Sequence, residues 1–522
     1  MKGAGGALAV VGVIAALVFL GPGSQSVAGP ASAQQGGTLV FAIGIPVTSL
    51  DPGMSAGAPE ISVRRAIYEQ LVQLGEGGEI RPGLATSWQV SDDGRVLTFS
   101  LRRNVRFHDG TLLTASAVKA SLDRLLDPAQ GLPLRFGLTW IKAVEAVGDL
   151  TVRISSDTPF GPALRHLANA SASIISPAAL RQYGKDVAWR PVGTGPYRFE
   201  THVPGESVTL VRFDGYWGGR PPLDRIVVRT VREDATRVAL LETGEAQIVD
   251  NVPGTEVPRL QKDGRVKIKL DASTRVAHIG INVQRPPFNN VKVRQALNYA
   301  VYRRAIVRGV LHDVGVPVST IFSPATWGYA DLGMYPYDSN RAKQLLAEAG
   351  YPNGFQTVLW TPDGRYYMDR QTAVAVQGQL ALVGVQAEVR VIDWATYLQV
   401  LRRPFETSET QLYLLGWESG TGDAAYVLDL VFASSAWPPR SWNTMFYRNP
   451  EVDRLIAAGA RETDLRKRMK IYEDLQRIVM TDAPWIPLFA YQHIAGLARN
   501  VEGVQVLPGE EYVLRDVYFS RQ

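Results

Sequence analysis

The sequence contains no cysteine. The chain can therefore form no disulfide bond, no thiolate nucleophile and no cysteine-ligated zinc or iron–sulfur site. It also lacks the bias of disordered or collagen-like chains, because 46% of its residues are apolar and 20% are charged. At 522 residues the chain exceeds the ~250–300 residues that one hydrophobic core supports. We expect a globular protein of at least two domains.

A strong excess of charge of one sign is also missing, since the formal net charge is only +5. Proteins that bind nucleic acid usually carry a basic stripe. The densest basic cluster, residues 461–470, also holds Glu462 and Asp464, a mixture typical of a solvated helix face. We expect no nucleic-acid partner.

Long hydrophobic runs are absent beyond the N-terminus. Residues 7–20 form a small and apolar run that is too short to span a bilayer, and a Gly-Pro-Gly break and the tripeptide Ala31-Ser32-Ala33 follow it. This pattern predicts a signal peptide over residues 1–33 and a mature chain that begins at Gln34; an uncleaved membrane anchor is the alternative. A lipid-attachment site is excluded because it needs cysteine. We expect a periplasmic or secreted protein.

Enzymatic motifs are scarce. Residues 53–57 fit the G-x-S-x-G pattern with Ser55 as nucleophile, and His493 could act as its base. However, several loop residues separate Ser55 from the strand expected before it. None of the six histidines has a second one at metal-ligand spacing, and Gly193-Thr194-Gly195 lacks the third glycine of a dinucleotide-binding loop. We expect no catalysis, metal or cofactor; a secreted serine hydrolase using Ser55 is the alternative from another class.

Helical and strand patterns alternate along the chain without a recurring period of ~20–50 residues. A strand is expected at 37–45, a helical pattern at 61–74, and a hairpin from 87–90 and 96–101. A helix should begin after Thr114 and end before Asp127-Pro128. The second half predicts helices at 291–309, 340–349, 370–382, 449–460 and 464–480.

A domain boundary is expected at residues 270–276, where a strand at 266–270 leads to an alternating run at 278–283. We expect the chain to return across this boundary near residues 485–493. Two domains joined by a few crossing segments form a hinge, and the cleft between them is the expected binding site.

Motifs along nearly the whole mature chain resemble the family 5 extracellular solute-binding proteins, which are the dipeptide, oligopeptide, nickel and glutathione receptors of ABC importers. Two later stretches, GWESGTGDAAYVLDLVFASSAWPP (416–439) and NTMFYRNPEVDRLI (443–456), look most like the glutathione-binding and related peptide receptors. The matching stretches in order are GGTLVFAIGIPVTSLDP (36–52), AIYEQLV (66–72), RPGLATSW (81–88), LRRNVRFHDGTLLTASAVKAS (101–121), VGTGPYRFE (192–200), INVQRPPFNNVKVRQALNYAV (281–301), YDSNRAKQLLAEAGYPNGF (337–355) and DAPWIPLF (482–489).

The resemblance implies an α/β, two-lobed periplasmic-binding-protein-like fold with a ligand cleft between the lobes. Lobe I would cover residues 36–271, with an extra subdomain at about 83–191, and lobe II residues 272–492. The tail, 493–522, would return to lobe I. The resemblance also implies a monomer without cofactor that closes on a short peptide or a glutathione-like ligand and docks on a membrane permease.

A zwitterionic ligand in a closed cleft needs a cation for its carboxylate and an anion for its ammonium, because unpaired buried charges are costly. Arginine is the best carboxylate clamp. Arg365 follows a predicted strand in a loop where this family often carries a ligand-contacting arginine, so we expect it to bind the carboxylate. We expect Asp423 to bind the ammonium.

The chain departs from the dipeptide receptors here, because Trp417-Glu418-Ser419-Gly420 has glycine where their W-x-G-D motif has aspartate. Either Asp423 or Glu418 takes over, or the ligand has no free ammonium. Trp417 is expected to stack on the ligand, and Gly193-Thr194-Gly195 to pair with its backbone. The missing aspartate and the eleven tryptophans leave an oligosaccharide or another non-peptide solute as an alternative.

Overall fold

The computed structural model describes residues 33–521 except 35, 56 and 76. The predicted signal peptide therefore lies outside the described residues apart from Ala33. Within the described part of the chain, no helix is both long enough and apolar enough to cross a membrane.

The sheet of lobe I surrounds strand β2 (Thr38–Ile43), which lies where the sequence predicts the first strand. Strands β11 (Arg225–Thr230) and β12 (Ile248–Val249) flank β2 in parallel, and β10 (Ser207–Arg212) and β9 (Tyr197–Val203) continue beyond β11 as antiparallel strands. The expected helical run at 61–74 is only partly helical: α1 (Ala58–Ile67) ends early, and β3 (Val72–Leu74) follows and pairs with β4 (Ile80–Pro82).

The extra subdomain has its own four-stranded antiparallel sheet. Its strands, in spatial order, are β5 (Ala85–Val90), β6 (Val96–Leu101), β8 (Thr151–Ser155) and β7 (Ala143–Ala146). Helix α2 (Ala115–Leu126) begins as the sequence predicts, because Thr114 Oγ1 accepts a hydrogen bond from Ala117 N at 3.3 Å. The subdomain packs a separate core around Phe99 and Leu122.

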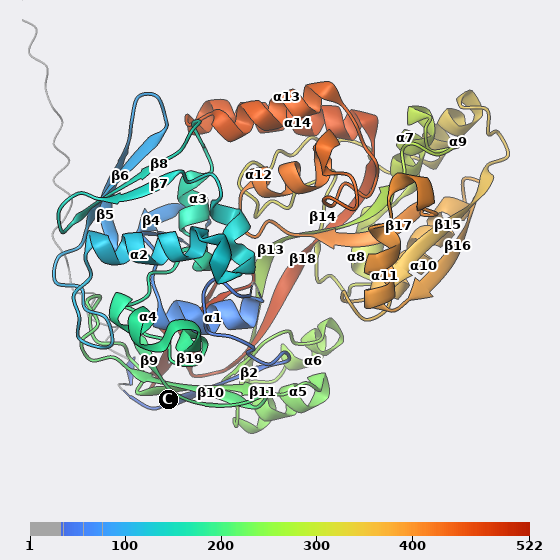
Figure 1. Cartoon of the computed structure of the whole chain (residues 1–522). Helices are drawn as coiled ribbons and strands as arrows, with labels where there is room; N and C mark the ends of the chain where they lie inside the picture. The colour runs from blue at the N-terminus through green and yellow to red at the C-terminus, as the bar shows by residue number, and fades with distance from the viewer. Residues whose placement is uncertain (1–32, 35, 56, 76, 522) are drawn as a thin grey trace, which may run out of the picture.

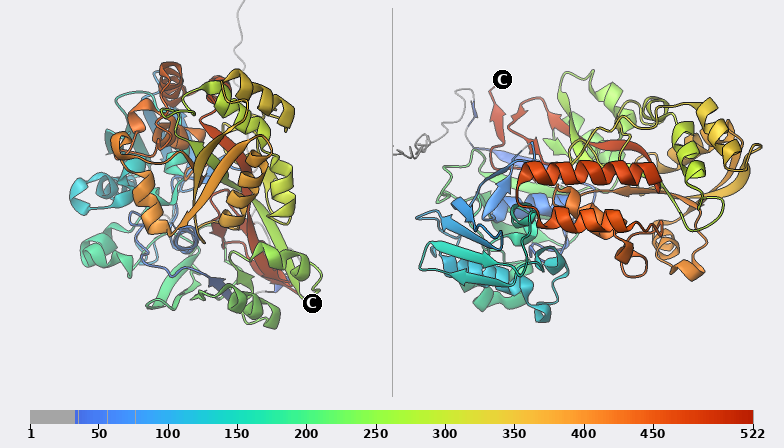
Figure 2. Two further views of the ribbon diagram at one scale, coloured as in Figure 1. Left: turned by 90° about the vertical axis from the view of Figure 1, so that its right-hand side faces the viewer. Right: turned by 90° about the horizontal axis from the view of Figure 1, so that it is seen from above.

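Lobe II places helices around strands β15 (Phe355–Pro362), β16 (Val385–Ile392) and β17 (Leu412–Trp417). The single helix expected at 291–309 is instead split into α7 (Val291–Ala300) and α8 (Arg303–Gly309), because Tyr302 N donates to Gln379 Oε1 at 2.7 Å rather than to the preceding turn. Other helices of this lobe are α9 (Ser339–Glu348), α10 (Asp369–Ala381), α11 (Trp394–Leu401), α12 (Ala424–Val427), α13 (Pro450–Arg461) and α14 (Leu465–Asp482). Figure 2 shows α13 and α14 lying side by side.

Two long antiparallel strands, β13 (Val266–Ile281) and β18 (Trp485–Ala498), connect the lobes and are called the crossing strands (Figure 1). They join the strands of both lobes into one continuous sheet. Ile486 of β18 packs in the core of lobe II, whereas Leu497 packs in the core of lobe I. The register of the pair shifts between Ala272 and Val276, the stretch where the sequence predicts the domain boundary.

Lobe I also carries α3 (Ala163–Leu167) and α4 (Pro177–Tyr183) in the extra subdomain, and α5 (Asp234–Thr243) and α6 (Val257–Leu260) beside its sheet. The tail returns to lobe I, where β22 (Tyr518–Ser520) pairs with β1 (Ala33–Gln34) and β19 (Val501–Glu502). The remaining strands are β14 (Val316–Pro317), which pairs with β18, and β20 (Gln505–Val506) with β21 (Tyr512–Val513).

Candidate functional site between the lobes

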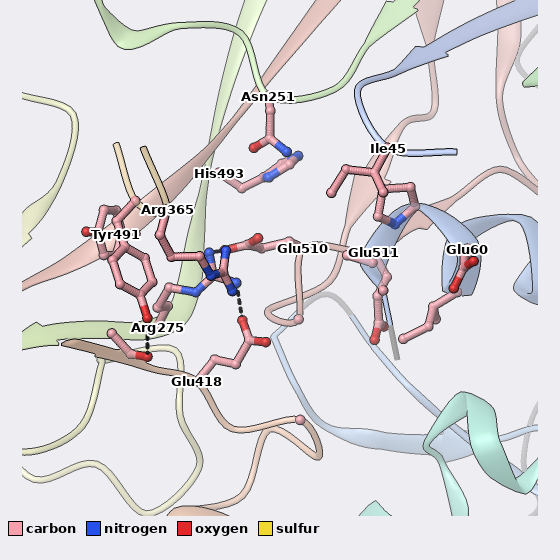
Figure 3. A pocket seen from close by; sticks show the side chains of 18 of the residues that line it. Ile45, Glu60, Asn251, Arg275, Arg365, Glu418, Tyr491, His493, Glu510 and Glu511 are labelled. Atoms are coloured by element: carbon pink, nitrogen blue, oxygen red, sulfur yellow. Dashed lines mark hydrogen bonds and ion pairs between the residues drawn. The ribbon is translucent and has the colours of Figure 1, made fainter. Parts of the chain in front are cut away.

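A cavity of about 1160 Å³ lies between the lobes, and both lobes, the crossing strands and the tail contribute to its walls. Its charged side chains come from segments far apart in sequence (Figure 3). These include Glu60 from α1, Arg275 from β13, Arg365 after β15, Glu418 after β17, and Glu510 and Glu511 from the tail.

Arg275 joins three parts of the wall. Its guanidinium contacts Glu418, and its Nη1 lies 3.4 Å from Glu510 Oε1. Glu510 also accepts a hydrogen bond from Ser273 Oγ at 2.8 Å. Burial acts to raise the pKa of Glu510, but Arg275 and the other nearby positive groups outweigh it and hold that pKa below its ordinary value. Glu510 is therefore a carboxylate at neutral pH.

The Arg365 side chain is exposed in the cavity and forms no ion pair among the described residues, although it is one of the positive groups that lower the pKa of Glu510. Its backbone N–H donates to Asp369 Oδ2 at 2.9 Å, which fixes the loop after β15. Its guanidinium lies 5.0 Å from the ring centroid of Tyr366 and 5.1 Å from that of Trp394. Two aromatic faces thus hold a cation that remains free to bind an anionic ligand group.

The acidic groups on the lobe I side of the cavity are held by their neighbours. Glu60 accepts hydrogen bonds from Thr48 N at 2.5 Å and from Thr48 Oγ1 at 2.6 Å, and Glu511 lies 3.0 Å from Arg65. In Figure 3 these two carboxylates lie across the cavity from Arg365. A ligand lying between the lobes would therefore meet charges of both signs.

Aromatic rings form much of the lobe II wall. Trp417 packs against Trp442 with their ring centroids 5.6 Å apart. Phe136 lines the cavity from lobe I, and the other aromatic side chains that line it are Tyr366, Tyr367, Trp394, Trp417, Tyr426, Trp442 and Tyr491. No cluster of three or more histidine, aspartate or glutamate residues in the described ranges could hold a metal ion. The arrangement suits a small polar solute that carries both charges and apolar surface.

The sequence profile of the bacterial extracellular solute-binding proteins, family 5 middle region, matches residues 79–439. The chain belongs to this family. It is 36% identical to the glutathione-binding protein GsiB of Escherichia coli (strain K12) over 481 residues, which cover 92% of this chain and 94% of that protein. The resemblance seen in the sequence motifs is thereby confirmed, and the chain is a solute-binding protein of the ABC-importer class.

Solved structures confirm the predicted fold. The structure of HbpA2 from Haemophilus parasuis aligns with a TM-score of 0.84 at 30% identity and covers 93% of this chain and 100% of that chain. The ABC transporter-associated periplasmic binding protein DppA from Helicobacter pylori, in complex with the peptide STSA, aligns with a TM-score of 0.76 at 30% identity and covers 94% and 99%.

Asp423 does not line the cavity of this family 5 protein, which corrects the role expected of it. Its side chain is fully buried, and its Oδ1 accepts hydrogen bonds from Arg468 Nη2 at 2.5 Å and from Ala425 N at 2.9 Å. Asp423 therefore caps α12 and neutralises a buried arginine. A carboxylate occupied in this way is not available to a ligand ammonium.

Gly193-Thr194-Gly195 also lies outside the cavity wall, contrary to expectation. Gly195 N donates to Ile67 O at 2.9 Å, and the Gly193 carbonyl accepts from His108 N at 2.9 Å. The Thr194 hydroxyl donates to Glu69 Oε2 at 2.8 Å. The backbone groups expected to pair with a ligand are thus used within lobe I.

Three of the expected residues do line the cavity: Arg365, Trp417 and Glu418. Ser55 lines it as well, but its Oγ accepts a weak hydrogen bond from Gly57 N at 3.4 Å. His493 Nε2 instead lies 2.9 Å from Tyr512 Oη and 3.2 Å from Asp250 Oδ1. Among the described residues, no histidine is hydrogen-bonded to Ser55, the contact expected between a serine nucleophile and its base.

Arg275 and Glu510 line the cavity but are not predicted from the sequence. Arg275 lies inside the segment expected to be the domain boundary, and Glu510 lies in the tail, where no sequence motif indicates a binding role. The one available signal was the polar run Ser273-Thr274-Arg275 interrupting a strand pattern. Charged side chains are rarely fully buried unless they are paired, so an arginine at this point is consistent with a strand that faces a cavity.

Proposed function

We propose that this protein captures a short zwitterionic peptide, with glutathione as the leading candidate, and delivers it to the permease of an ABC importer. The observation that carries the proposal is the unpaired Arg365 cation, which lies in an interlobe cavity that also presents carboxylates. The name of GsiB and the peptide bound to DppA point to the same ligand class. The protein acts as an exported monomer without a cofactor and catalyses no reaction.

Arg365 binds the carboxylate end of the ligand, and Glu418 binds the ammonium in place of Asp423. Glu418 suits this role because its side chain is 45% exposed and its only ion-pair partner in the described chain, Arg275, keeps Glu510 as a second carboxylate. Trp417 contacts the apolar part of the ligand. This assignment supports a ligand with both termini free.

Two lobes close around the ligand about the crossing strands. Lobe I covers residues 36–271, with the extra subdomain at 83–191, lobe II covers 272–492, and the tail 493–522 returns to lobe I. The irregular register between Ala272 and Val276 supports a hinge there, because fewer ladder hydrogen bonds resist bending.

Calorimetric titration of the mature protein with reduced glutathione, oxidised glutathione, di- to tetrapeptides and oligosaccharides tests the proposal. We expect saturable binding of glutathione or a short peptide and none of the sugars. Binding of sugars alone, which the aromatic wall would also accommodate, would contradict it.

Signal-peptide cleavage is tested by N-terminal sequencing of exported protein, where Gln34 is expected.

A further inference from the structure

The buried carboxylate of Asp423 interacts with one arginine from each lobe. Its Oδ1 binds Arg468 from α14 in lobe II. Its Oδ2 has no hydrogen-bond partner in the described chain but lies 3.6 Å from Nε of Arg165. Arg165 belongs to α3 in the extra subdomain of lobe I. The Arg165–Asp423 ion pair therefore crosses between the lobes.

Other contacts cross at the same place. Arg165 Nη1 donates to the carbonyl of Gly422 at 3.5 Å, and its guanidinium lies 5.5 Å from the ring centroid of Trp327. Asn169 Nδ2, four residues further along lobe I, donates to the carbonyl of Gly420 at 2.8 Å. Lobe I thus holds a short segment of lobe II through its backbone as well as through Asp423.

This segment, residues 418–423, is called the closure loop. Glu418, Ser419, Gly420 and Thr421 of the loop line the ligand cavity. The backbone N–H of Ser419 also donates to Thr274 Oγ1 of crossing strand β13 at 3.2 Å. One loop therefore touches the ligand cavity, a crossing strand and lobe I. Such a loop can transmit lobe closure to the ligand site by direct contact.

We propose that Arg165 is a positioning residue, which holds the closure loop against lobe I in the closed form and thereby raises ligand affinity without touching the ligand. Arg165 does not line the ligand cavity. The effect on affinity rests on the proposed function, whereas the effect on lobe closure does not. Affinity rises because the binding-competent closed form becomes more populated.

The charges make this contact reversible. Arg468 neutralises Asp423 inside lobe II whether the lobes are open or closed, since both residues belong to that lobe. When the lobes open, Asp423 therefore keeps a charge partner, and only Arg165 becomes exposed to water. This costs far less free energy than leaving a buried charge without a partner. A contact of this kind favours closure without locking it.

The first test compares Arg165→Met with Arg181→Met, which removes an exposed arginine of the same subdomain that forms no ion pair in the described chain. We expect Arg165→Met to raise the dissociation constant of reduced glutathione about 5- to 50-fold, within the usual range of coupling between sites. Arg165→Lys should restore part of the affinity. The loss of affinity caused by Arg165→Met should be equal for glutathione and for its glycine amide, because lobe closure does not distinguish the end groups of the two ligands.

The second test needs no ligand. In ligand-free protein, Arg165→Met should speed hydrogen exchange in residues 417–423 and enlarge the radius of gyration measured by small-angle scattering, while Arg181→Met should change neither. Identical exchange and scattering in the two variants would overturn the proposal. If wild-type protein bound neither glutathione nor peptides, the proposed function would fail, and exchange and scattering would still decide the role of Arg165.

Discussion

Arg275 Nη1 lies 3.4 Å from Glu510 Oε1, so a crossing strand is tied to the C-terminal tail inside the ligand cavity. The same guanidinium contacts Glu418 on lobe II. The Glu510 side chain is 12% exposed, whereas that of Glu418 is 45% exposed. Glu418 can therefore exchange Arg275 for a ligand ammonium, while Glu510 keeps the arginine neutralised.

Replacing Glu418 tests the ammonium site. Glu418→Gln should weaken binding of a ligand with a free amine by about 1.5–3 kcal/mol, the usual contribution of a charged hydrogen bond, and should barely affect the N-acetylated ligand. Calorimetric titration measures both. The matched control is Glu409→Gln, which changes an exposed glutamate of the same lobe outside the cavity. Equal losses for the amine and its acetylated form would contradict the assignment.

Replacing Arg365 tests the carboxylate site. Arg365→Ala should weaken a free-acid ligand by about 1.5–3 kcal/mol and matter little for its amide, because only the acid presents an anion to the guanidinium. Arg370→Ala, in the exposed first turn of α10, serves as the control. If the variant kept the wild-type preference for acid over amide, Arg365 would not bind the carboxylate.

Replacing Asp423 should reduce stability rather than ligand selectivity. Asp423→Asn leaves the buried Arg468 without its charge partner, which should lower the free energy of unfolding by about 3–5 kcal/mol in denaturant titration. Asp338→Asn is the control, because Asp338 caps α9 at an exposed position where asparagine caps equally well. A selective loss of free-amine ligands in Asp423→Asn would restore the role first expected of Asp423.

Local patterns explain which parts of the fold the sequence predicts. The hairpin of β5 and β6 and the start of α2 depend on turn residues and on Thr114, all within a few residues of the elements they control. The position of the crossing strands is also visible, because a polar interruption marks the irregular register near Ala272. Such signals need no knowledge of distant partners.

The placement of site residues depends on distant partners and could not be predicted in the same way. Asp423 follows a strand that leads to the cavity, yet Arg468 lies 45 residues later and Arg165 lies on another lobe. Glycine at 193 suggests a ligand-facing backbone, but a Cβ there would collide with the carbonyl of Ile67. In both cases packing between distant segments decides which groups remain free.

Ligand binding should make the protein more compact. A ligand that binds only the closed form stabilises it by about 2.7 kcal/mol at a hundredfold excess over its dissociation constant. Small-angle scattering should therefore give a smaller radius of gyration with saturating ligand than without it. An unchanged radius at saturation would argue against a hinge at the crossing strands.

Acid should selectively remove the contribution of His108 to stability. His108 Nε2 lies 3.0 Å from the Gly195 carbonyl, and its Nδ1 accepts from Gly193 N at 3.4 Å, an arrangement that requires the neutral ring. Burial lowers the pKa of His108 from 6.5 to about 4. Because the folded-state pKa lies below the unfolded one, the contribution is complete above about pH 6.5 and declines as the pH falls toward 4.

The excess stability of wild type over His108→Gln should therefore be smaller at pH 4.5 than at pH 7.5, because glutamine does not titrate and every other group is shared by the two proteins. Denaturant titration at both pH values measures this difference in the free energy of unfolding. The control is His312→Asn, which removes an exposed histidine at a positive φ that asparagine also tolerates. A constant difference between wild type and His108→Gln would mean that His108 takes up its proton in the folded protein as readily as in the unfolded chain.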